Sequence, residues 1–424
     1  MLKPHRVFAG RCLLALASCA GLAAAQAFEP PPGANVVSVL TFGAVPNDGG
    51  DDLAAFQAAL NVTVGTSRIL YVPNGTYNLS GRLNWGGIGL GGFFTMQGQS
   101  KEGVILKLND SAVGFTDPAA PRAFIDAYEG NTANQFRNYL RDVTIDIGAN
   151  NLGAIGLEFQ ANNTGRIENV TIRSSDPQKR GLTGLNQGFE FPGPLLIRNL
   201  TIDGFETGYV GAPQEYSVVF ENLTLQNQRT RGIYVWRLPL QIRNLVSQNS
   251  VPVLFNDGNP GASGHVVIDG GTFTGGAPGT DAISNENSAG VLILRNITTS
   301  GYANAVSDKS FSVTNPVLVP GGVVTQFTTD APASLNATPS AILDLPIEET
   351  PDAPAIPVSQ WASVKTFGAI ENDNLDDTAA IQAAMNSGAP VVYFPSGLYY
   401  VSDTITVGPA VQRVEGLMSD LSLN

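Results

Sequence analysis

The sequence predicts an all-β fold, a parallel β-helix with a short N-terminal capping helix, followed by the start of a second β-helix. Three observations predict it. A six-residue motif recurs between residues 140 and 300, a longer segment occurs twice, and the composition favours turns over helices. Only 14% of the 424 residues are charged, against about 25% in a typical soluble protein, while 47 are Gly and 33 are Asn.

Residues 1–27 have the pattern of a secretory signal peptide. A basic start precedes the apolar run Cys12–Leu22, which is too short for a membrane span. Ala25-Gln26-Ala27 supplies the small residues that signal peptidase requires, so Phe28 is the expected first residue of a secreted or periplasmic protein. No later segment reaches the ~20 apolar residues of a transmembrane helix.

An alternative interpretation gives the leader a different fate. Leu16-Ala17-Ser18-Cys19 is similar to a bacterial lipobox, in which case Cys19 carries a lipid anchor. If the leader is cleaved after Ala27, both cysteines are removed. We then expect no disulfide, no cysteine nucleophile and no cysteine metal site. We also expect no other metal and no cofactor.

The charge balance restricts the partners. Without the leader, 20 basic and 36 acidic residues remain, a net charge of −16 against −13 for the whole sequence. Such a surface repels phosphate backbones, so we expect no nucleic-acid partner. The same repulsion disfavours an acidic pectin as the substrate.

The strongest internal signal is a segment that occurs twice. Residues 38–60 read SVLTFGAVPNDGGDDLAAFQAAL and residues 363–385 read SVKTFGAIENDNLDDTAAIQAAM, with 15 of 23 positions identical. A second match follows in each copy, at 69–77 and 391–399. Each copy predicts a strand, a loop, a short helix and another strand. Because a short helix is unstable alone, we expect it to pack on the open end of a stack of strands.

Acidic residues precede each predicted helix. Asp52 and Asp377 are expected to be N-caps, because a carboxylate there accepts otherwise unpaired backbone N–H groups and suits the helix dipole. We assign a structural capping role to the adjacent Asp51 and Asp376 as well. The alternative is a pair of catalytic acids or a metal site, and the capping role is favoured because both copies begin with the same residues.

A shorter repeat occupies residues 140–300. Its core is an apolar residue, any residue, Asn, Asp or Gly, an apolar residue, Thr, and a further apolar residue. The central residues lie 27, 30, 23, 22, 26 and 26 positions apart and are Asp142, Asn169, Asn199, Asn222, Asn244, Gly270 and Asn296. Repeats of this length with short strands are typical of a parallel β-helix, whose core grows in one dimension.

The residue types in this motif predict their places in each coil. Asn, Asp and Gly tolerate the left-handed backbone conformation best, so the central position is expected to be a recurrent bend. Stacked Asn side chains can form a hydrogen-bonded ladder. The Thr two places later is expected to point outward, with the flanking apolar residues inward.

The pattern changes after Phe311. Eight prolines between residues 315 and 358 predict a semi-rigid connector. We therefore divide the chain into a signal peptide at 1–27, a first β-helix with its cap at 28–311, a Pro-rich connector at 312–360, and the cap and first strands of a second, incomplete β-helix at 361–424.

The repeated segment carries a resemblance to a known group of proteins. Phe42-Gly43-Ala44, Asp51-Asp52, Ala54–Ala59 and Val72–Tyr77 together resemble the N-terminal module of the pectate-lyase-like superfamily. This resemblance implies a right-handed parallel β-helix that acts on polysaccharides.

Two such modules, joined by a connector that leads to Trp361, are similar to glycoside hydrolase family 55, the exo-β-1,3-glucanases. The resemblance implies hydrolysis of β-1,3-glucan or a related glycan with inversion, by an acid and a base-activated water. In that family the cleft lies between two full β-helices and the acid is a glutamate of the second. Here the second module reaches only its first strands by Asn424, so we expect a truncated form in which no residue matches that acid.

Candidate substrate-binding residues cluster in the coils after Asn222. Consecutive coils stack ~4.8 Å apart, so aromatic and polar side chains on them can converge on one surface. The candidates for binding a polysaccharide are Gln226, Gln228, Tyr234, Trp236, Asn256 and Asp257. The alternative is that Tyr234 and Trp236 are ordinary strand residues beside a loop.

Glu190 is the one candidate for a catalytic carboxylate, since it lies between Phe189 and Phe191. The alternative is a solvated turn residue.

Three functions remain open: a secreted glycoside hydrolase, a non-catalytic β-helix that binds polysaccharide or serves as a surface scaffold, and a pectate-type lyase. The lyase would need clustered carboxylates for calcium, and no such cluster is evident in the sequence. We favour the hydrolase and leave open whether this chain alone is catalytic.

Overall fold

The computed structural model describes residues 27–423 apart from 67, 86–93, 129, 131–134, 213–215, 258–263, 287–288, 332, 334, 336–337, 339–349 and 351–354. The expected signal peptide, except its last residue, and the lipid-anchor candidate Cys19 lie outside the described residues.

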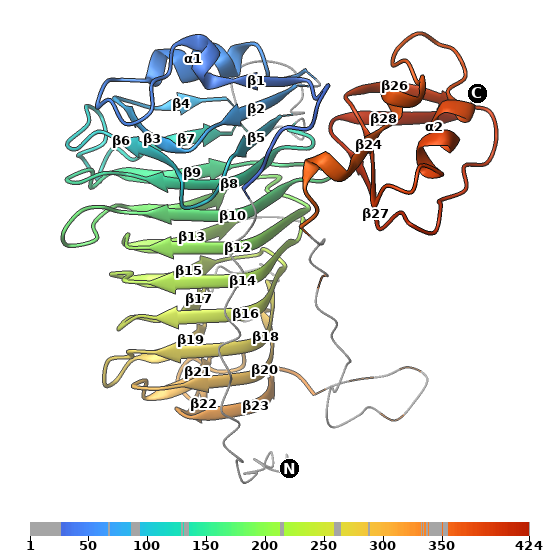
Figure 1. Cartoon of the computed structure of the whole chain (residues 1–424). Helices are drawn as coiled ribbons and strands as arrows, with labels where there is room; N and C mark the ends of the chain where they lie inside the picture. The colour runs from blue at the N-terminus through green and yellow to red at the C-terminus, as the bar shows by residue number, and fades with distance from the viewer. Residues whose placement is uncertain are drawn as a thin grey trace.

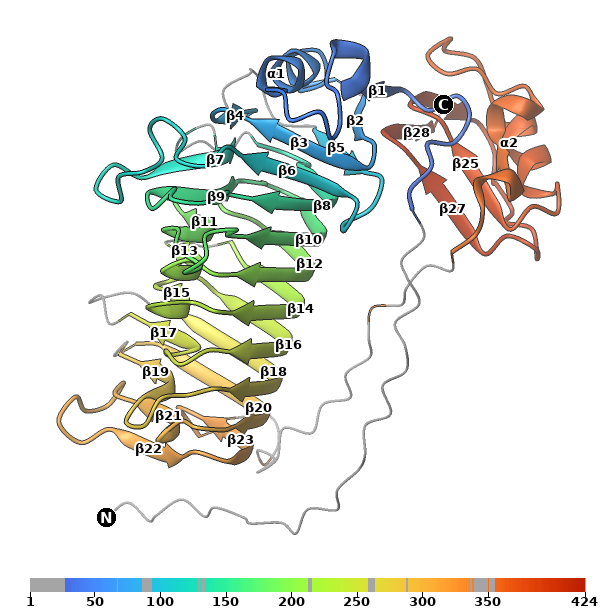
Figure 2. The ribbon, with the colours of Figure 1, turned by 60° about the vertical axis from the view of Figure 1, so that its left-hand side comes forward.

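The chain forms a tall parallel β-helix with a smaller β module beside its N-terminal end (Figure 1). The parallel β-helix predicted from the repeats is confirmed. Its strands stack coil upon coil in two long sheets (Figure 2).

Sheet A follows the order β1 (Val36–Ser38), β2 (Ile69–Val72), β5 (Thr95–Gly98), β8 (Tyr139–Asp146), β10 (Arg166–Arg173), β12 (Leu195–Asp203), β14 (Val218–Gln226), β16 (Leu240–Gln248), β18 (His265–Thr274), β20 (Val291–Thr299) and β23 (Val323–Thr328). Two more strands join beside this path, β3 (Gly75–Leu79) and β6 (Val104–Leu108).

Sheet B follows the order β4 (Leu83–Asn84), β7 (Arg122–Ala127), β9 (Ala154–Phe159), β11 (Thr183–Gly188), β13 (Thr207–Ala212), β15 (Arg231–Val235), β17 (Leu254–Asn256), β19 (Asp281–Asn285), β21 (Asn304–Asp308) and β22 (Val317–Pro320).

The predicted bend and ladder are confirmed within sheet A. All seven central residues have positive φ angles, between 54° at Asn169 and 80° at Gly270. Asn169 donates to Asp142 at 3.0 Å, Asn199 to Asn169 at 2.8 Å, and Asn222 to Asn199 at 2.9 Å. The flanking apolar residues point inward, as Ile167, Val170 and Ile172 show with no exposed surface. Each coil thus bends at the same angle and places its apolar side chains in one continuous core.

Charges alternate in sign along the outer face of sheet A. The residues in register on successive strands are Arg141, Glu168, Arg198, Glu221, Arg243, Asp269 and Arg295. Arg198 lies 3.5 Å from Glu168 and 3.2 Å from Glu221. Thr350 of the connector joins this row, because its carbonyl accepts from Arg198 at 3.0 Å and its hydroxyl donates to Glu221 at 2.5 Å.

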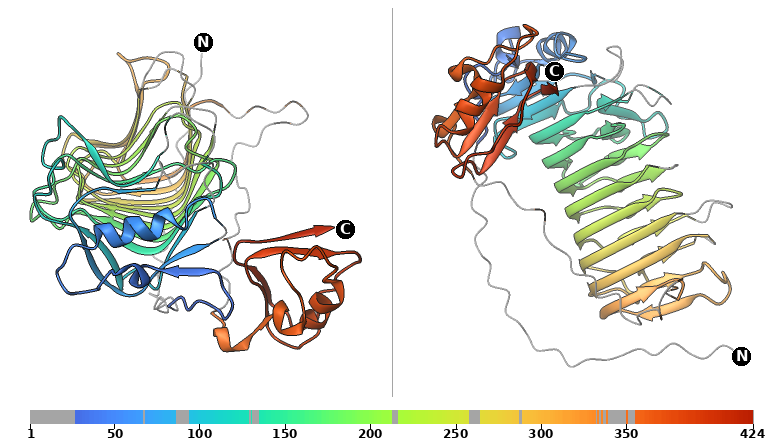
Figure 3. Two further views of the ribbon diagram at one scale, coloured as in Figure 1. Left: turned by 90° about the horizontal axis from the view of Figure 1, so that it is seen from above. Right: turned by 90° about the vertical axis from the view of Figure 1, so that its right-hand side faces the viewer.

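The two ends of the β-helix are closed differently. Helix α1 (Leu53–Asn61) lies across the N-terminal end (Figure 3, left) and buries Phe56, Ala59 and Leu60 against the core. At the far end β22 and β23 pair antiparallel with the last parallel strands. These two strands lie within the stretch 312–360 that we assigned to the connector.

The residues at the helix N-termini differ from the prediction in their hydrogen bonds. Asp52 and Asp377 occupy the N-cap positions, but neither carboxylate bonds the helix that it precedes. Asp52 Oδ1 instead accepts the N–H of Val45 at 2.8 Å and so fixes the preceding loop. The first N–H of α1 is bonded by Asp51, at 3.2 Å. The neighbouring strands thus decide which carboxylate faces the helix, and sequence spacing alone does not show this.

The second module repeats the start of the first. It contains β24 (Trp361–Ser363), α2 (Thr378–Met385), β25 (Val391–Phe394), β26 (Gly397–Val401), β27 (Arg413–Gly416) and β28 (Ser419–Leu423), in two parallel sheets β24-β25-β27 and β26-β28. Three 3-10 turns accompany the two starts, η1 (Val39–Phe42), η2 (Val358–Gln360) and η3 (Val364–Phe367). The module has its own hydrophobic core and approaches sheet A where Thr95 Oγ1 lies 3.9 Å from Met418 Sδ.

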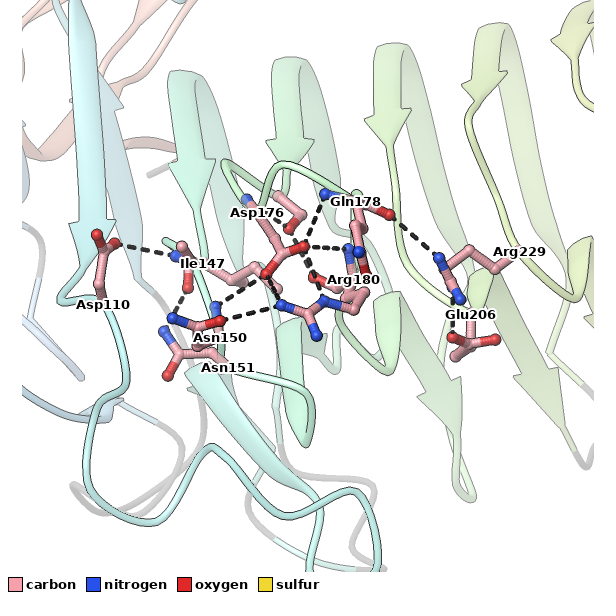
Figure 4. A network of polar contacts seen from close by, with 11 residues as sticks. Asp110, Ile147, Asn150, Asn151, Asp176, Gln178, Arg180, Glu206 and Arg229 are labelled. Atoms are coloured by element: carbon pink, nitrogen blue, oxygen red, sulfur yellow. Dashed lines mark hydrogen bonds and ion pairs between the residues drawn. The ribbon is translucent and has the colours of Figure 1, made fainter.

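A polar network fixes the corner where sheet A turns toward sheet B (Figure 4). Asp176 is 1% exposed, and its carboxylate accepts from the Arg180 guanidinium at 2.9 and 2.7 Å. These bonds, together with backbone N–H donors, hold the pKa of Asp176 well below its usual range despite burial. Farther along, Arg229 donates to Glu206 at 2.9 Å. The charged groups of this network pair with one another and so stabilise the corner.

In the described part of the chain, neither helix is long and apolar enough to cross a membrane.

Candidate active site

A single row of outward-facing residues runs along sheet B. The residues in register on successive strands are Asn84, Asp126, Glu158, Asn186, Val210, Tyr234, Phe255, Ser284 and Ser307. Two carboxylates are direct neighbours in this row, Asp126 on β7 and Glu158 on β9. In-register residues on adjacent strands lie ~4.8 Å apart, so the strand pairing itself brings two acids together.

Asp126 is held as a buried carboxylate. Its residue is 3% exposed, and its side chain forms an ion pair with Arg82, which precedes β4. Its Oδ1 also accepts the N–H of Tyr128 at 3.0 Å. A cation and a backbone N–H both favour the ionised form.

Glu158 lies in a different environment. Burial raises the pKa of the Glu158 carboxyl above its ordinary value, and this effect outweighs the hydrogen bond from Asn186 and the charge of Arg82. Asn186 on β11 donates to Glu158 Oε1 at 2.7 Å, so the carboxyl group is held in a fixed orientation. Glu158 therefore keeps a proton to higher pH than an exposed glutamate does.

Together these two carboxylates have the properties of an acid–base pair. Asp126 is paired with the Arg82 guanidinium, and burial raises the pKa of Glu158 so that it keeps its proton to higher pH. Neighbouring acids whose environments push their pKa values apart are the usual basis of general acid and general base roles. The arrangement can donate a proton from Glu158 and accept one at Asp126.

An aromatic surface adjoins the pair. Tyr128 stacks on Phe189 with ring centroids 4.3 Å apart and planes inclined by 27°. Burial, followed by the nearby charges of Glu158 and Glu190, raises the pKa of Tyr128, so its hydroxyl stays neutral at ordinary pH. Glu190, the catalytic candidate from the sequence, is half-buried just past β11 and lies close enough to Tyr128 to act on it electrostatically.

The structure separates the six predicted substrate-binding residues. Tyr234 and Asp257 are together on sheet B, where the Tyr234 hydroxyl donates to Asp257 Oδ2. Trp236 is half-buried just past β15. Gln226 ends β14 of sheet A and is in register with Asp203 and Gln248, on a different face of the β-helix.

Two of the six predicted residues are buried and hold the coils together. Gln228 is 4% exposed and donates to the carbonyls of Ile202, Gly204 and Gln226. Asn256 has no exposed surface and donates to Asn285 at 2.8 Å. The prediction that they bind substrate is therefore wrong. Buried amides satisfy backbone groups that the tight turns leave unpaired, and the sequence gives no sign of their burial.

Arg82, Asp126 and Glu158 are not among the site residues predicted from the sequence. A signal for the two acids exists, since each is a lone acid between apolar residues, in Ile125-Asp126-Ala127 and Leu157-Glu158-Phe159. On a strand this pattern places the acid outward between two inward side chains. Recognising the pair also requires the coil register, which was not evident before residue 140.

No three His, Cys, Asp or Glu side chains lie together as a metal site would require, within the residues that the structure describes.

Comparison with known families identifies the class of protein. The family profile described as "Rhamnogalacturonase A/epimerase, pectate lyase-like" matches residues 36–261 and 361–412. The chain belongs to this family, and its resemblance to the pectate-lyase-like superfamily is confirmed. The second matched block, 361–412, lies in the second module, whose first part repeats the sequence of residues 38–60.

Several solved structures are similar to parts of this chain. ORF18 of Geobacillus virus E2 is 14% identical with a TM-score of 0.43, over 64% of this chain and 54% of that one. The catalytic unit of the GH87 α-1,3-glucanase from Streptomyces thermodiastaticus strain HF3-3 is 16% identical with a TM-score of 0.41, over 67% and 66%. The A-module of the Azotobacter vinelandii mannuronan C-5 epimerase AlgE6 is 17% identical with a TM-score of 0.40, over 63% and 69%.

The chain thus spans about half of the viral protein and just under two thirds of the glucanase unit. A sequence search among curated proteins finds no match.

Proposed function

We propose that this protein is a secreted, polysaccharide-active glycoside hydrolase whose acid–base pair is Glu158 and Asp126. The observation that carries the proposal is the register of β7 and β9, which makes two carboxylates in different environments direct neighbours. Family membership supports a polysaccharide substrate. Secretion is supported by the leader pattern at 1–27, with a lipid anchor at Cys19 as the alternative.

Glu158 is the general acid in this mechanism. It donates its proton to the glycosidic oxygen as the bond to the anomeric carbon breaks, and the leaving sugar departs as an alcohol. Asp126 accepts a proton from the water that attacks the anomeric carbon, so one water is consumed and the products are a new reducing end on one fragment and an alcohol on the other. Exchange with solvent then returns the proton to Glu158 and removes it from Asp126. The Arg82 guanidinium pairs with Asp126 and favours negative charge on it.

The finer proposal is an inverting reaction on β-1,3-glucan or a related glycan, as the family 55 resemblance implies. Inversion requires the two carboxyl groups to stand ~6.5–9.5 Å apart, with room for the water. Neighbouring strands stand only ~4.8 Å apart, so inversion also requires the Asp126 and Glu158 side chains to diverge from their strands. The Arg82 guanidinium acts on both acids, since it pairs with Asp126 and its charge counteracts the raised pKa of Glu158. Release of the inverted anomer, followed by NMR at early times, is the expected outcome, and a retained anomer contradicts it.

The test of the proposal is sugar release by the Glu158→Gln variant. We expect hydrolysis to fall by about 10²–10⁴-fold, because the amide cannot donate the proton. Glu286→Gln is the matched control, since Glu286 lies at the edge of sheet B and pairs with Lys309 at 2.5 Å, away from the pair. Reducing ends are measured on β-1,3-glucan first and then on a panel that includes rhamnogalacturonan.

The pH profile adds a readout that loss of folding does not mimic. Asn186 lowers the pKa of Glu158 through its hydrogen bond, so Asn186→Ala raises that pKa. The acid then stays protonated to higher pH, and the alkaline limb of the activity profile moves upward. An unchanged limb, or a wild-type protein that releases no sugar from any substrate, contradicts the proposal. Carbohydrate binding without release identifies a non-catalytic β-helix, and unsaturated products identify a lyase.

A further inference from the structure

We propose that a second carbohydrate-binding site lies lower on sheet B, centred on Arg231, and that it holds a distant part of the polysaccharide chain bound at Asp126 and Glu158. The identity of its ligand rests on the proposed function. The site itself is inferred from four side chains on two neighbouring coils.

The four side chains form one compact cluster. Tyr234 on β15 is in register with Phe255 on β17, and their rings lie 6.2 Å apart with planes inclined by 14°. The Arg231 guanidinium lies over both rings, 4.8 Å from the Tyr234 centroid and 5.1 Å from the Phe255 centroid. Asp257 accepts the hydroxyl of Tyr234 at the edge of the cluster. All four residues are half-buried, so part of each faces solvent.

Arg231 differs from most arginines of this β-helix. Arg173, Arg180 and Arg229 each have a carboxylate oxygen within 2.9 Å. Among the residues that the structure describes, no carboxylate pairs with Arg231 and no acceptor receives a hydrogen bond from its guanidinium. A guanidinium stacked on rings still directs its N–H donors outward in its own plane. This half-buried cation therefore has donors to offer to a ligand rich in oxygen.

The other members of the cluster complete a surface suited to a sugar. Burial, followed by the hydrogen bond to Asp257, raises the pKa of Tyr234 to about 12, so its hydroxyl is neutral at ordinary pH. Tyr234 and Phe255 are half-buried, so the exposed part of each ring offers apolar area to a pyranose. Sugar oxygens, either hydroxyls or the carboxylate of a uronate, supply the acceptors that Arg231 lacks.

The distance to the catalytic pair predicts how the site acts. Tyr234 and Glu158 are three coils apart in the same row, on β15 and β9, which is about 14 Å at ~4.8 Å per coil. One or two sugars cannot bridge that distance. A chain lying along the β-helix axis can occupy both sites, so binding should strengthen with chain length.

The test measures affinity in the Glu158→Gln protein, where turnover is suppressed. Binding of β-1,3-gluco-oligosaccharides and oligogalacturonides, from dimer to octamer, is followed by calorimetry. Adding Arg231→Gln should weaken octamer binding by about tenfold or more and leave dimers unchanged. Tyr234→Phe keeps the ring but loses the bond to Asp257, and should give a smaller loss. Arg229→Gln is the matched control, because Arg229 precedes the same strand and already has its partner Glu206.

The two series of oligosaccharides distinguish a neutral from an acidic sugar at Arg231, and loss in either one supports the site. The proposal is overturned if octamers of both kinds bind the Arg231→Gln protein as tightly as its parent, or if neither kind binds the parent. Failure of the hydrolase proposal is seen separately, as absence of sugar release by the wild type while the Arg231→Gln loss of binding persists.

Discussion

The two module starts of this chain share one local structure but differ in burial. Asp52 Oδ1 accepts the N–H of Val45 at 2.8 Å, and Asp377 Oδ1 accepts the N–H of Ile370 at 2.9 Å. A tyrosine after each helix also donates its hydroxyl to a proline carbonyl. The distance is 2.9 Å for Tyr77 and 3.0 Å for Tyr399.

The next coil makes the difference between them. Met96 and Leu106, on β5 and β6 of the first module, have no exposed surface because β8 continues the stack. In the same places of the second module, Val414 on β27 is 48% exposed and Leu421 on β28 is 55% exposed. A coil therefore takes its shape from its own sequence, whereas the burial of its apolar side chains depends on the neighbouring coil.

The largest expected effect comes from truncating the matched leucines. Leu106→Ala removes a side chain from the continuous core and should lower the free energy of unfolding by about 2–5 kcal/mol. Leu421→Ala removes a half-exposed side chain and should cost less than about 1 kcal/mol. Urea unfolding of both variants measures the difference, and equal losses would show that neighbouring coils do not govern burial.

An intermediate loss of stability is expected at the equivalent residues Asp52 and Asp377. Here the residue of the second module should matter more than that of the first. Asp377 accepts two backbone N–H groups, from Ile370 at 2.9 Å and Tyr400 at 3.1 Å. Asp52 accepts the N–H of Val45 at 2.8 Å and only a weaker bond from the N–H of Asn78, the residue equivalent to Tyr400. Asp377→Ala should therefore cost about 1–3 kcal/mol and Asp52→Ala less. Chemical denaturation tests this order, and a larger loss for Asp52→Ala contradicts it.

The smallest effect is a pH dependence of opposite sign at two non-equivalent aspartates, Asp52 of the first module and Asp376 of the second. Asp51, which is the equivalent of Asp376, also has a lowered pKa. Burial, aided by Asp48 and Asp51, raises the pKa of Asp52, so its contribution to stability is greatest below the unfolded value of about 3.9 and falls as pH rises. Hydrogen bonds from Thr378 and Ser402 lower the pKa of Asp376, so its contribution is present above that value and is lost as pH falls.

Thermal unfolding between about pH 3 and 6 therefore should improve in Asp52→Asn toward the upper end of the range. In Asp376→Asn the wild-type decline at low pH should become shallower. Shifts of the same sign in both variants would contradict the environments described for the two residues.

Much of the fold was predictable because its signals are local. Asn tolerates positive φ angles, so Asn169, Asn199 and Asn222 each predict a bend at their own position. The bend recurs at the same place in successive coils. The capping helices follow from repeated, periodic segments. The hydrogen bonds at Asp52 were not predictable, because the partner Val45 is selected by how the loop folds back.

The site was less predictable because it depends on register between distant residues. Asp126 and Glu158 are 32 positions apart in the sequence and become neighbours only when β7 and β9 align. The coils before residue 140 lack the recurrent motif that would have shown this alignment. Gln228 and Asn256 were predicted to face the substrate because polar side chains usually lie at the surface, but both are buried.

The alternating charges on sheet A make the loss or gain of a single coil unfavourable in this β-helix. Removing the coil that carries Arg198 would bring Glu168 against Glu221, and removing the coil of Glu221 would bring Arg198 against Arg243. Like charges directly opposite each other destabilise a sheet. Removing two adjacent coils restores opposite signs. Gain or loss of coils in pairs therefore costs less electrostatic energy in this row than gain or loss of a single coil.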